Sequence, residues 1–405
     1  MARFVGDSPR RQPVHTVYGG AHLFRAGTPR HLGELALKAL DENAPDAAAF
    51  STAVGMARGL AENVYPRVVE KLEREPVEDF RIDFEDGYGN RTDDEEDGHA
   101  LAAAHQLAKG MREKTLSPFI GLRIKPMTEE LRVRSLRTLD ILVTELVLSE
   151  KKLPQNFVVT LPKVQIPEQV TALVDVLEAL EKGLNLAPKS IPFEIMIEQT
   201  QAIFDSNGQV AMPKLIDASR GRCIAAHFGS YDYTASCNIT AAHQHMLHPS
   251  CDFAKNVMQV SLGGTGIWLS DGATNVLPIG EKRVVSEAWK LHMLHTRHSL
   301  ETGFYQGWDL HPAQLPARFA AVYAFFLEAL PAASERLKNF VAKAAQATLV
   351  GDVFDDAATG QGLLNFFLRG INCGAIREDE ALATGLTLEE IRGRSFVKIL
   401  EKRRA

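Results

Sequence analysis

The strongest constraint on the fold is an alternation of short apolar runs with helix-like stretches along most of the chain. Eight of these runs have strand character, and the helical periodicity between them is typical of a parallel α/β protein. Eight strands alternating with helices over about 300 residues favour a closed (β/α)₈ TIM barrel. The runs span residues 15–18, 79–84, 118–124, 157–161, 193–198, 223–232, 275–279 and 304–310.

An open, doubly wound sheet is the alternative fold. It requires a glycine-rich phosphate turn after the first strand, and the segment Gly19-Gly20-Ala21-His22 matches such a turn poorly. A second glycine-rich segment, at 263–266, lacks both the P-loop lysine and the full dinucleotide fingerprint. The barrel is therefore the preferred prediction, and neither segment indicates a nucleotide.

The chain divides into three predicted parts. Residues 1–13 are a basic, proline-containing arm, residues 14–316 form the barrel, and residues 317–405 form a helical C-terminal extension. The segment 387–390, Thr-Leu-Glu-Glu, has the form of a capping box at the start of the last helix. Because the extension has few apolar residues for an independent domain, we expect it to pack on the barrel or on a neighbouring subunit.

Composition excludes several classes of protein. The 405 residues are 45% hydrophobic and 24% charged, so the chain can bury a sizeable core. A net charge of −6 gives no indication of binding to nucleic acid or an anionic membrane, and no uninterrupted apolar run has the length of a membrane span. The start of the chain lacks an apolar secretory segment, and the four cysteines lack CxxC spacing, which predicts a cytoplasmic protein with reduced thiols.

Two of the apolar runs end in carboxylates that suit a metal. One run ends at Glu198 and the next at Asp232, a separation that fits one strand–helix–strand unit. Parallel neighbouring strands would then present both side chains at the same edge. Oxygen ligands on a rigid rim suit Mg²⁺, which keeps several waters that a substrate can displace. We predict Glu198 and Asp232 as ligands of Mg²⁺, with Mn²⁺ as a substitute. Capping of the following helices is the alternative role.

Other strand-like runs also end in polar side chains. In a barrel the carboxyl ends of all strands converge on one mouth, where catalytic groups lie. A mixture of acids and cations suits a metal-bound anionic substrate, and the cations would stabilise a developing enolate. Arg123 can also be interpreted as a structural ion-pair partner, and Lys163 as a solvated lysine. The side chains are Glu85, Asp86, Arg123, Lys163 and His311.

Two further clusters have simple interpretations. The acidic run 93–97 is predicted to be a solvated loop. Three histidines lie close to two cysteines between residues 237 and 251, but their spacing matches no standard zinc site. We therefore favour loop or helix-surface histidines over zinc ligands.

Seven short segments, in the same order along the chain, resemble those of the citrate lyase beta-subunit-like and malyl-CoA lyase-like aldolases. The resemblance spans roughly residues 15–360, and the GSYDY segment is also similar to malate synthases. The segments are Asp83–Gly87 (DFEDG), Gly121–Ile124 (GLRI), Leu161–Val164 (LPKV), Ile197–Glu198 (IE), Gly229–Tyr233 (GSYDY), Trp308–Gln314 (WDLHPAQ) and Gly351–Ala357 (GDVFDDA).

The resemblance implies a TIM barrel of the phosphoenolpyruvate/pyruvate-binding superfamily with a divalent metal, usually Mg²⁺. Glu198 and Asp232 would be its protein ligands, and Glu85 and Asp86 would hold metal-bound waters. Arg123 would bind the substrate carboxylate and the enolate oxygen.

The resemblance also implies a homotrimer or homohexamer. Asp355, supplied by a neighbouring protomer, would be the acid or base, with Asp356 beside it as the alternative. The chain departs from the family pattern where Gln199 precedes Thr200 and where residues 240–272 form a long, histidine-rich insert. That insert leaves the identity of the substrate open.

The predicted function is that of a divalent-metal-dependent carbon–carbon lyase or aldolase. Its substrate would be a small keto acid or a malyl-CoA- or citryl-CoA-type thioester, cleaved through a metal-stabilised enolate. Because fold does not fix chemistry, thioester hydrolysis or phosphotransfer on a small carboxylate remains an alternative, as does a non-catalytic barrel subunit. The side chains assigned to catalysis are Arg123, Lys163 and Asp355, and those assigned to substrate binding are Arg123, Glu85, Asp86 and His311.

Overall fold

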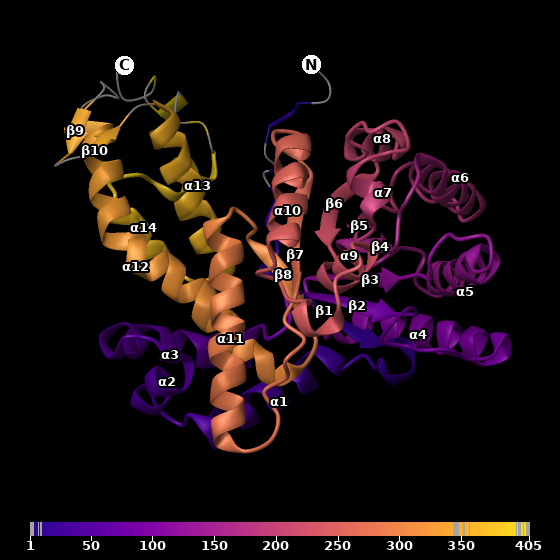
Figure 1. Ribbon diagram of the computed structural model, residues 1–405, viewed down its shortest axis with the longest axis horizontal. Helices are drawn as coiled ribbons and strands as arrows, with labels where there is room; N and C mark the ends of the chain where they lie inside the picture. The colour runs from indigo at the N-terminus through magenta and orange to yellow at the C-terminus, as the bar shows by residue number, and fades with distance from the viewer. Residues whose placement is uncertain are drawn as a thin grey trace.

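Eight parallel strands close into a barrel in the order of the sequence (Figure 1). The computed structural model describes residues 4–6, 8, 10–342, 348–350, 353–355, 357–393, 395, 398–399 and 401. The last strand pairs with the first, so the sheet has no free edge and the predicted TIM barrel is confirmed. The strands are β1 (His15–Gly20), β2 (Asp79–Asp83), β3 (Phe119–Arg123), β4 (Phe157–Leu161), β5 (Phe193–Ile197), β6 (Cys223–Phe228), β7 (Trp268–Ala273) and β8 (Gln306–Asp309).

Helices surround the barrel and bury the outward face of each strand. In β2 the aromatic and aliphatic side chains Phe80 and Ile82 point to the helices, whereas Arg81 points into the barrel. The helices are α1 (Thr28–Asn43), α2 (Ala47–Val54), α3 (Arg58–Arg74), α4 (Asp93–Glu113), α5 (Arg132–Glu150), α6 (Pro167–Gly183), α7 (Thr200–Ile203), α8 (Met212–Ala218), α9 (Ser230–Ser236), α10 (Pro249–Leu262), α11 (Lys282–Glu301) and α12 (Leu315–Ala342).

A charged layer fills the middle of the barrel, where branched apolar side chains are usual. Arg81 donates to Glu194 through Nε at 3.0 Å and through Nη2 at 2.9 Å, and it also pairs with Asp79. Thr160 Oγ1 and His227 Nε2 lie 2.5 and 3.1 Å from the same carboxylate. Burial opposes the charge of Glu194, but Arg81 and His227 hold the pKa of Glu194 well below its ordinary value. The barrel interior therefore depends on ion pairing.

The seventh strand is not where the sequence predicted it. The apolar segment 275–279 is a loop, and β7 lies earlier, at Trp268–Ala273. Because this segment contains the polar residues Ser270 and Asp271, its sequence lacks the continuous apolar character that is typical of a buried strand. Both are fully buried, and Asp271 is paired with Lys255 Nζ at 2.9 Å and with Ser299 Oγ at 2.7 Å. The contacts of Asp271 with Lys255 and Ser299 therefore stabilise a strand that contains polar residues.

The acidic run 93–97 is also not the solvated loop that was predicted. It forms the first turn of α4, and Thr92 and Glu95 close a capping box in front of it. Carboxylates at this end of a helix are favoured by the exposed backbone N–H groups. Glu96 is buried, where it lies 3.0 Å from Lys125 Nζ. The Thr92-x-x-Glu95 spacing was the sequence signal for a helix start.

The C-terminal extension begins inside α12. The first half of α12 packs on α3 and α11, and its later part contacts α13 (Ala357–Cys373). A short hairpin, β9 (Thr348–Val350) and β10 (Val353–Asp355), joins α12 to α13 and was not predicted. The expected capping box at Thr387 is present at the start of α15 (Leu388–Arg392), which follows α14 (Glu378–Leu382).

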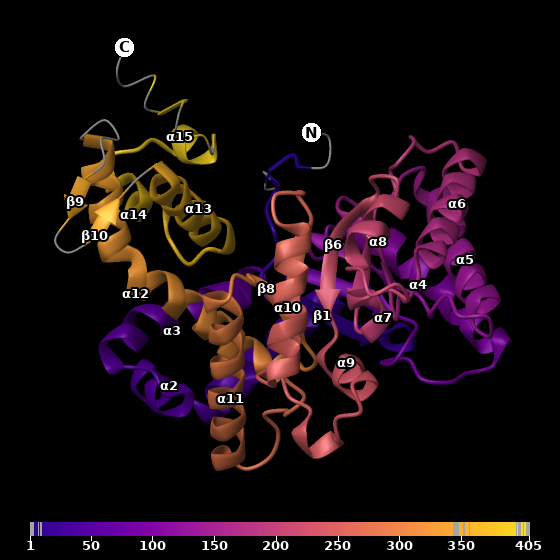
Figure 2. The same cartoon turned by 45° about the horizontal axis from the view of Figure 1, so that its top comes forward.

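Barrel and extension share one hydrophobic core. Phe319 and Phe326 of α12 and Phe367 of α13 belong to the same buried cluster as the barrel strands. Figure 2 shows α12 running from the barrel to the hairpin and α13. Residue 316, the predicted boundary of the barrel, falls at the start of α12, and the division into domains stays a prediction.

One stretch of the described residues, Pro312–Ala342, is long and apolar enough to cross a membrane, with a mean hydropathy of 1.2. However, 61% of that window is buried inside the protein. The core helix of a globular protein meets the same criterion of length and composition. Packing of α12 on the barrel accounts for its apolar sequence.

Candidate functional site

Lys163 joins the acidic side chains at the carboxyl end of the barrel. It follows β4 with a positive φ of 51°, and its Nζ pairs with Glu85 and lies 3.2 Å from Asp86 Oδ1 and 3.7 Å from Asp232 Oδ2. Its backbone N–H donates to Glu198 Oε1 at 2.6 Å. Four predicted carboxylates, which follow β2, β5 and β6 in the chain, are thus gathered around one lysine.

Arg123 lies beneath this cluster and is held from two sides. Asp83 accepts from its Nε at 2.7 Å and from its Nη2 at 2.6 Å, and the ring of Tyr18 lies 4.7 Å from its guanidinium carbon. The remaining nitrogen, Nη1, is 3.1 Å from Glu85 Oε2 and 3.5 Å from Asp86 Oδ2. Arg123 is therefore both an ion-pair partner and a member of the site.

Sequence reasoning missed Asp83 and Tyr18. Asp83 stands opposite Arg123 in the register of β2 and β3, and its carboxylate also accepts from the N–H groups of Glu85 and Gly87 at 3.0 and 2.8 Å. It thereby fixes the turn that carries the acidic pair. The sequence signal that could have indicated Asp83 was an aspartate at the end of an apolar run, in the strand before the one that carries Arg123.

The surroundings of the cluster disfavour the charged form of three of its carboxylates. Burial and the nearby Asp232 raise the pKa of Glu198 to about 8. Burial and Asp86 raise the pKa of Glu85 to about 7, and burial also raises the pKa of Asp232. A bound cation would offset this cost, because opposite charge favours the ionised form of a carboxylate.

The donor set suits a hard divalent cation. Glu198 is buried and Asp232 is half-buried, and both offer only oxygen. In the described part of the chain no three His, Cys, Asp or Glu side chains form a complete metal cage. Mg²⁺ is commonly held by one or two carboxylates plus water and substrate, so two protein ligands are sufficient.

Asp232 reaches the site from a helix. The sequence predicted a strand up to Asp232, but β6 ends at Phe228 and Asp232 lies in the first turn of α9. Gly229 makes the connection, and a Cβ atom there would lie 2.6 Å from Cβ of Glu198 and 2.3 Å from its Oε2. Only glycine lets the two metal-ligand candidates approach each other in this way.

Two predicted residues are not brought into the cluster. His311 caps its own turn, where its Nδ1 accepts from the N–H of Ala313 at 3.1 Å, and burial lowers its pKa. In the described part of the chain it makes no hydrogen bond or ion pair with the site carboxylates. Asp355 ends β10, which lies with α12 in the extension, away from the site loops (Figure 1). Asp356 lies outside the described residues.

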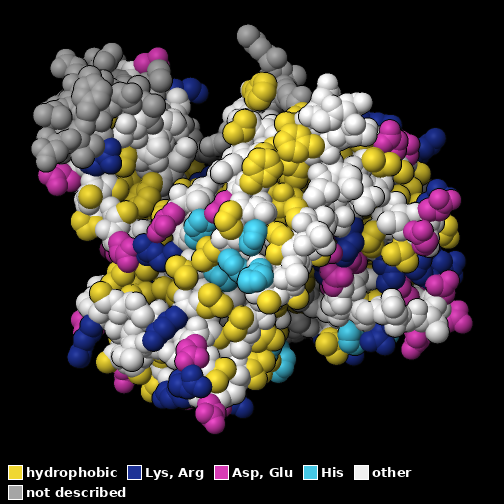
Figure 3. Space-filling view, in the orientation of Figure 1, with side chains coloured by type: hydrophobic (Ala, Val, Ile, Leu, Met, Phe, Trp, Pro, Cys, Tyr) yellow, Lys and Arg dark blue, Asp and Glu magenta, His cyan; other side chains and the backbone are white. Residues whose placement is uncertain are grey.

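Histidines gather on the face that carries α10 and α11 (Figure 3). The rings of His245 and His248 are 5.9 Å apart, and His248 Nδ1 accepts from the N–H of Ser250 to cap α10. His243 ends a short 3₁₀ turn. Within the residues that the structure describes, no three metal-binding side chains are arranged to hold zinc.

Protonation of His295 is expected to make the protein less stable in mild acid. Burial, and then the neighbouring His292, lower the pKa of His295 to about 4. An unfolded histidine has a pKa near 6.5, so the unfolded chain takes up the proton first as pH falls. The stabilisation is complete above about pH 6.5 and is lost toward pH 4, and it amounts to about 2–3 kcal/mol.

Urea unfolding at pH 7, 5.5 and 4.5 tests this expectation. As the pH is lowered, the free energy of unfolding should decrease less in His295→Asn than in wild type. His31→Asn, a change at an exposed histidine, is the control and should follow wild type. Identical slopes for all three proteins would contradict the assignment.

Three solved structures share this fold. A citrate lyase from Burkholderia xenovorans LB400 matches with a TM-score of 0.62 and 19% identity over 94% of this chain and 99% of that chain. The protein CitE from Mycobacterium tuberculosis, solved with magnesium, acetoacetate and coenzyme A, matches with a TM-score of 0.52 and 14% identity over 90% of this chain and 99% of that chain. A malate synthase from Haloferax volcanii, solved with lead(II), matches with a TM-score of 0.50 and 13% identity over 98% of this chain and 99% of that chain. The resemblance to citrate lyase beta-subunit-like barrels is confirmed at the level of the fold.

Sequence comparison gives a family without a known function. No curated protein matches the sequence. The profile of a family described as "Domain of unknown function (DUF6986)" matches residues 1–399. Because this match runs from the N-terminal arm to the last helix, the chain belongs to the DUF6986 family.

Proposed function

We propose that this protein is a divalent-metal-dependent carbon–carbon lyase or aldolase. Its substrate would be a small keto acid or a malyl-CoA- or citryl-CoA-type thioester. The observation that carries the proposal is the cluster in which Glu198 and Asp232, two carboxylates with raised pKa values, lie beside Lys163 and Arg123 at the barrel mouth. The similar fold of CitE, solved with magnesium, acetoacetate and coenzyme A, supports this class of substrate.

Glu198 and Asp232 would hold the Mg²⁺ ion, with Mn²⁺ as a substitute, and Glu85 and Asp86 would hold its waters. The bound ion would act as a Lewis acid toward the oxygen that becomes negatively charged when the carbon–carbon bond breaks. Lys163 lies among these carboxylates and limits their mutual repulsion when the ion is absent.

Arg123 would bind the carboxylate of the substrate. Asp83 holds two edges of the guanidinium and Tyr18 covers its face, so the group is fixed before the substrate arrives. Donors that are already in position need no rearrangement when charge develops, which is how such groups lower a barrier. The Nη1 nitrogen lies beside Glu85 and Asp86 and is the donor available at the mouth.

Product analysis tests the proposal. Purified protein with Mg²⁺ or Mn²⁺ is incubated with oxaloacetate, malyl-CoA and citryl-CoA, and the products are identified by mass spectrometry. Cleavage of a carbon–carbon bond, or its formation in the reverse direction, is the expected result. Release of free coenzyme A without such cleavage would instead support thioester hydrolysis. Absence of both turnover and metal binding would leave the non-catalytic barrel.

Gly229→Ala is expected to weaken metal binding at least about tenfold while the barrel stays folded. The new methyl group would overlap Cβ and Oε2 of Glu198, so both the carboxylate and the backbone that carries it must shift. Calorimetric titration with Mn²⁺ measures the affinity, and circular dichroism measures the fold. Gly59→Ala is the control, because nothing lies within 4 Å of the added atom. Equal affinities in the two variants would contradict the placement of Glu198 as a ligand.

Mixed oligomers test whether a neighbouring protomer supplies Asp355. Asp355→Asn and Glu198→Gln proteins should each be inactive. After unfolding and refolding together in equal amounts they should regain about a quarter of wild-type activity, because that fraction of sites pairs two intact residues in a symmetric oligomer. Refolding each variant alone is the control. No recovery, with oligomers shown by ultracentrifugation, would remove Asp355 from the proposed site.

A further inference from the structure

Basic side chains gather on the rim of the barrel mouth, around the ring of Tyr88 in the turn between β2 and α4. The hydroxyl oxygen of Tyr88 lies 2.7 Å from Nδ1 of His99, and its ring centre lies 5.7 Å from the ring centre of His22 and 5.0 Å from the guanidinium carbon of Arg91. Arg25 adjoins His22, because its Nη1 donates to the carbonyl oxygen of His22 at 3.3 Å. The rim cluster therefore comprises His22, Arg25, Arg91 and His99.

The rim cluster is built onto the turn that carries the acidic pair of the candidate site. The N–H of Tyr88 donates to the carbonyl oxygen of Glu85 at 3.0 Å, and Tyr88 is 3% exposed. A Cβ atom on Gly20 would lie 2.5 Å from the carbonyl oxygen of Gly87 and 2.9 Å from Nδ1 of His22. Glycine at this position lets the segment after β1 lie against the turn after β2. The rim cluster and the acidic pair are thus parts of one edge of the mouth.

The two arginines of the rim cluster have no carboxylate partner in the described part of the chain. Both are exposed. Nη1 of Arg25 donates to the carbonyl oxygens of His22 and Phe24 at 3.3 and 2.6 Å, and Arg91 lies over the ring of Tyr88. These contacts hold the guanidinium groups in place without neutralising them. The planar fork of an arginine suits the oxygen atoms of a phosphate group.

The charged groups that surround His22 within the rim cluster are all basic. Burial, and then the positive charges of Arg91, His99 and Arg25, lower the pKa of His22. Glu95, whose charge interacts with those of Arg91 and His99, is held in the capping box at the start of α4. A surface with an excess of one sign of charge raises the local concentration of ligands of the opposite sign. The rim cluster therefore favours an anionic occupant.

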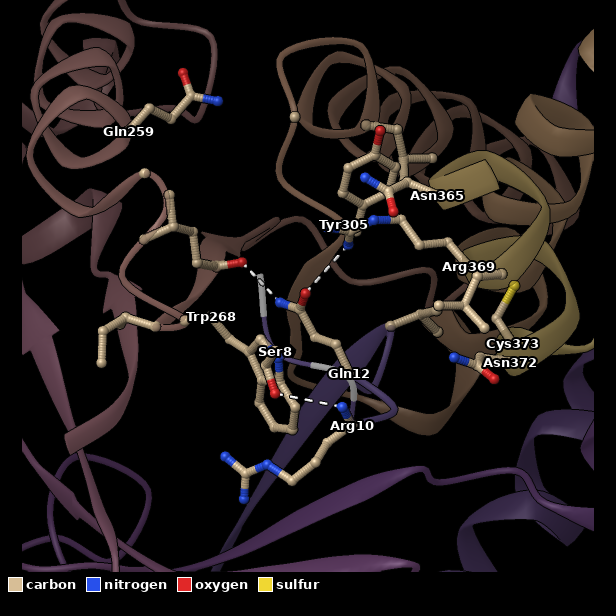
Figure 4. A pocket seen from close by; sticks show the side chains of 18 of the residues that line it. Ser8, Arg10, Gln12, Gln259, Trp268, Tyr305, Asn365, Arg369, Asn372 and Cys373 are labelled. Atoms are coloured by element: carbon tan, nitrogen blue, oxygen red, sulfur yellow. Dashed lines mark hydrogen bonds between the residues drawn. The ribbon is translucent and has the colours of Figure 1, made fainter. Parts of the chain in front are cut away.

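A substrate bound at Glu198 cannot extend through the barrel. Arg81 and Glu194 fill its middle, and both are buried. The cavity shown in Figure 4 lies beyond them, at the amino ends of the strands, where Gln12 donates to the carbonyl oxygen of Leu269 at 3.0 Å. Any part of a substrate that projects from the mouth must therefore lie on the rim, where the rim cluster supplies positive charge.

We propose that the rim cluster binds the phosphate groups of a thioester substrate of the coenzyme A type. This inference rests on the proposed function and selects between its two classes of substrate. A small keto acid would be held inside the mouth by the metal and Arg123, and it needs no cations on the rim. A coenzyme A thioester carries several phosphate charges outside the mouth. Arg25 and Arg91 would donate to their oxygen atoms, and such charge-assisted hydrogen bonds are stronger than neutral ones.

Titration of the metal-free protein with coenzyme A and with pantetheine tests the inference. Pantetheine has the thiol arm of coenzyme A but none of its phosphate groups. Calorimetry is expected to show saturable binding of coenzyme A and at least about tenfold weaker binding of pantetheine. The affinity for coenzyme A should also fall as salt is added, because salt screens exposed charges.

Substitution of the two arginines tests whether that affinity belongs to the rim cluster. Arg25→Gln and Arg91→Gln should each weaken the binding of coenzyme A at least about tenfold, while the circular dichroism spectrum stays the same. Arg112→Gln, in the last turn of α4 where Arg112 pairs with Glu150, is the control and should bind as wild type does. Unchanged affinity in both cluster variants would overturn the inference.

Failure of this inference can be told apart from failure of the proposed lyase. Glu198→Gln should bind coenzyme A as wild type does, so arginine-dependent binding without turnover would support the phosphate site alone. Cleavage of oxaloacetate by a protein that shows no saturable binding of coenzyme A would support the lyase and overturn the phosphate site. Equal affinities for coenzyme A and pantetheine would also overturn it.

Discussion

Glu198→Gln is expected to abolish metal binding and turnover without unfolding the barrel. The amide has the shape of the carboxylate and its oxygen can still accept from the N–H of Lys163, which now donates to Glu198 Oε1 at 2.6 Å. It carries no charge, so an Mg²⁺ ion would lose one of its two protein ligands. We expect the affinity for Mn²⁺ to fall at least about 100-fold, and kcat to fall with it.

The stability of the same variant separates the two interpretations of Glu198. Burial and the nearby Asp232 raise the pKa of Glu198 to about 8, so its ionised form is unfavourable in the metal-free protein. Glu198→Gln should then leave the metal-free protein as stable as wild type, or more stable. Glu62→Gln, an exposed change on α3, is the control for charge alone. A destabilised variant that still binds metal would assign Glu198 a purely structural role.

Arg81→Leu is expected to lower the free energy of unfolding by about 3–5 kcal/mol, because removing one partner of a buried ion pair leaves the other charge uncompensated. Arg81 lies between Asp79 and Glu194 in the middle of the barrel, and all three are buried. Leucine fills the space but leaves two carboxylates facing each other. Urea unfolding at pH 7 measures the loss.

Arg112→Leu is the matched control for that experiment. Arg112 pairs with Glu150 on the surface between α4 and α5, where an ion pair contributes within about 1 kcal/mol. If Arg81→Leu costs no more than Arg112→Leu, the charged layer does not stabilise the barrel. The double variant Arg81→Leu/Glu194→Leu should recover part of the loss, because one buried carboxylate is removed with its partner.

Much of the barrel could be predicted because its strands are buried on both sides. Runs such as Phe157–Leu161 and Phe193–Ile197 are largely apolar, and the chain between them has helical spacing. The strand at Trp268–Ala273 could not be found in this way. Its Asp271 is stabilised by Lys255 and Ser299, which belong to α10 and α11, and such partners become visible only when the helices are placed.

The cluster at the mouth could be predicted because strand ends in a closed barrel must converge. That rule alone brought Glu85, Arg123, Lys163 and Glu198 together from distant parts of the chain. It could not indicate that Asp83 would hold Arg123, because that contact depends on the register between two strands.

The charged layer was missed for the same kind of reason. Arg81 and Glu194 are separated by 113 positions, and each stands alone in a run that otherwise has strand character. Their pairing across the barrel follows from its curvature and the alternation of side chains. A single sequence gives no measure of either.

The continuity of α12 limits how this protein can change in evolution. The first half of the helix completes the outer wall of the barrel, and the second half carries α13, with Phe319 and Phe367 in one shared core. Gene fragments that end between barrel and extension would encode a protein with a large apolar face open to water. Recombination can therefore transfer the two parts only together.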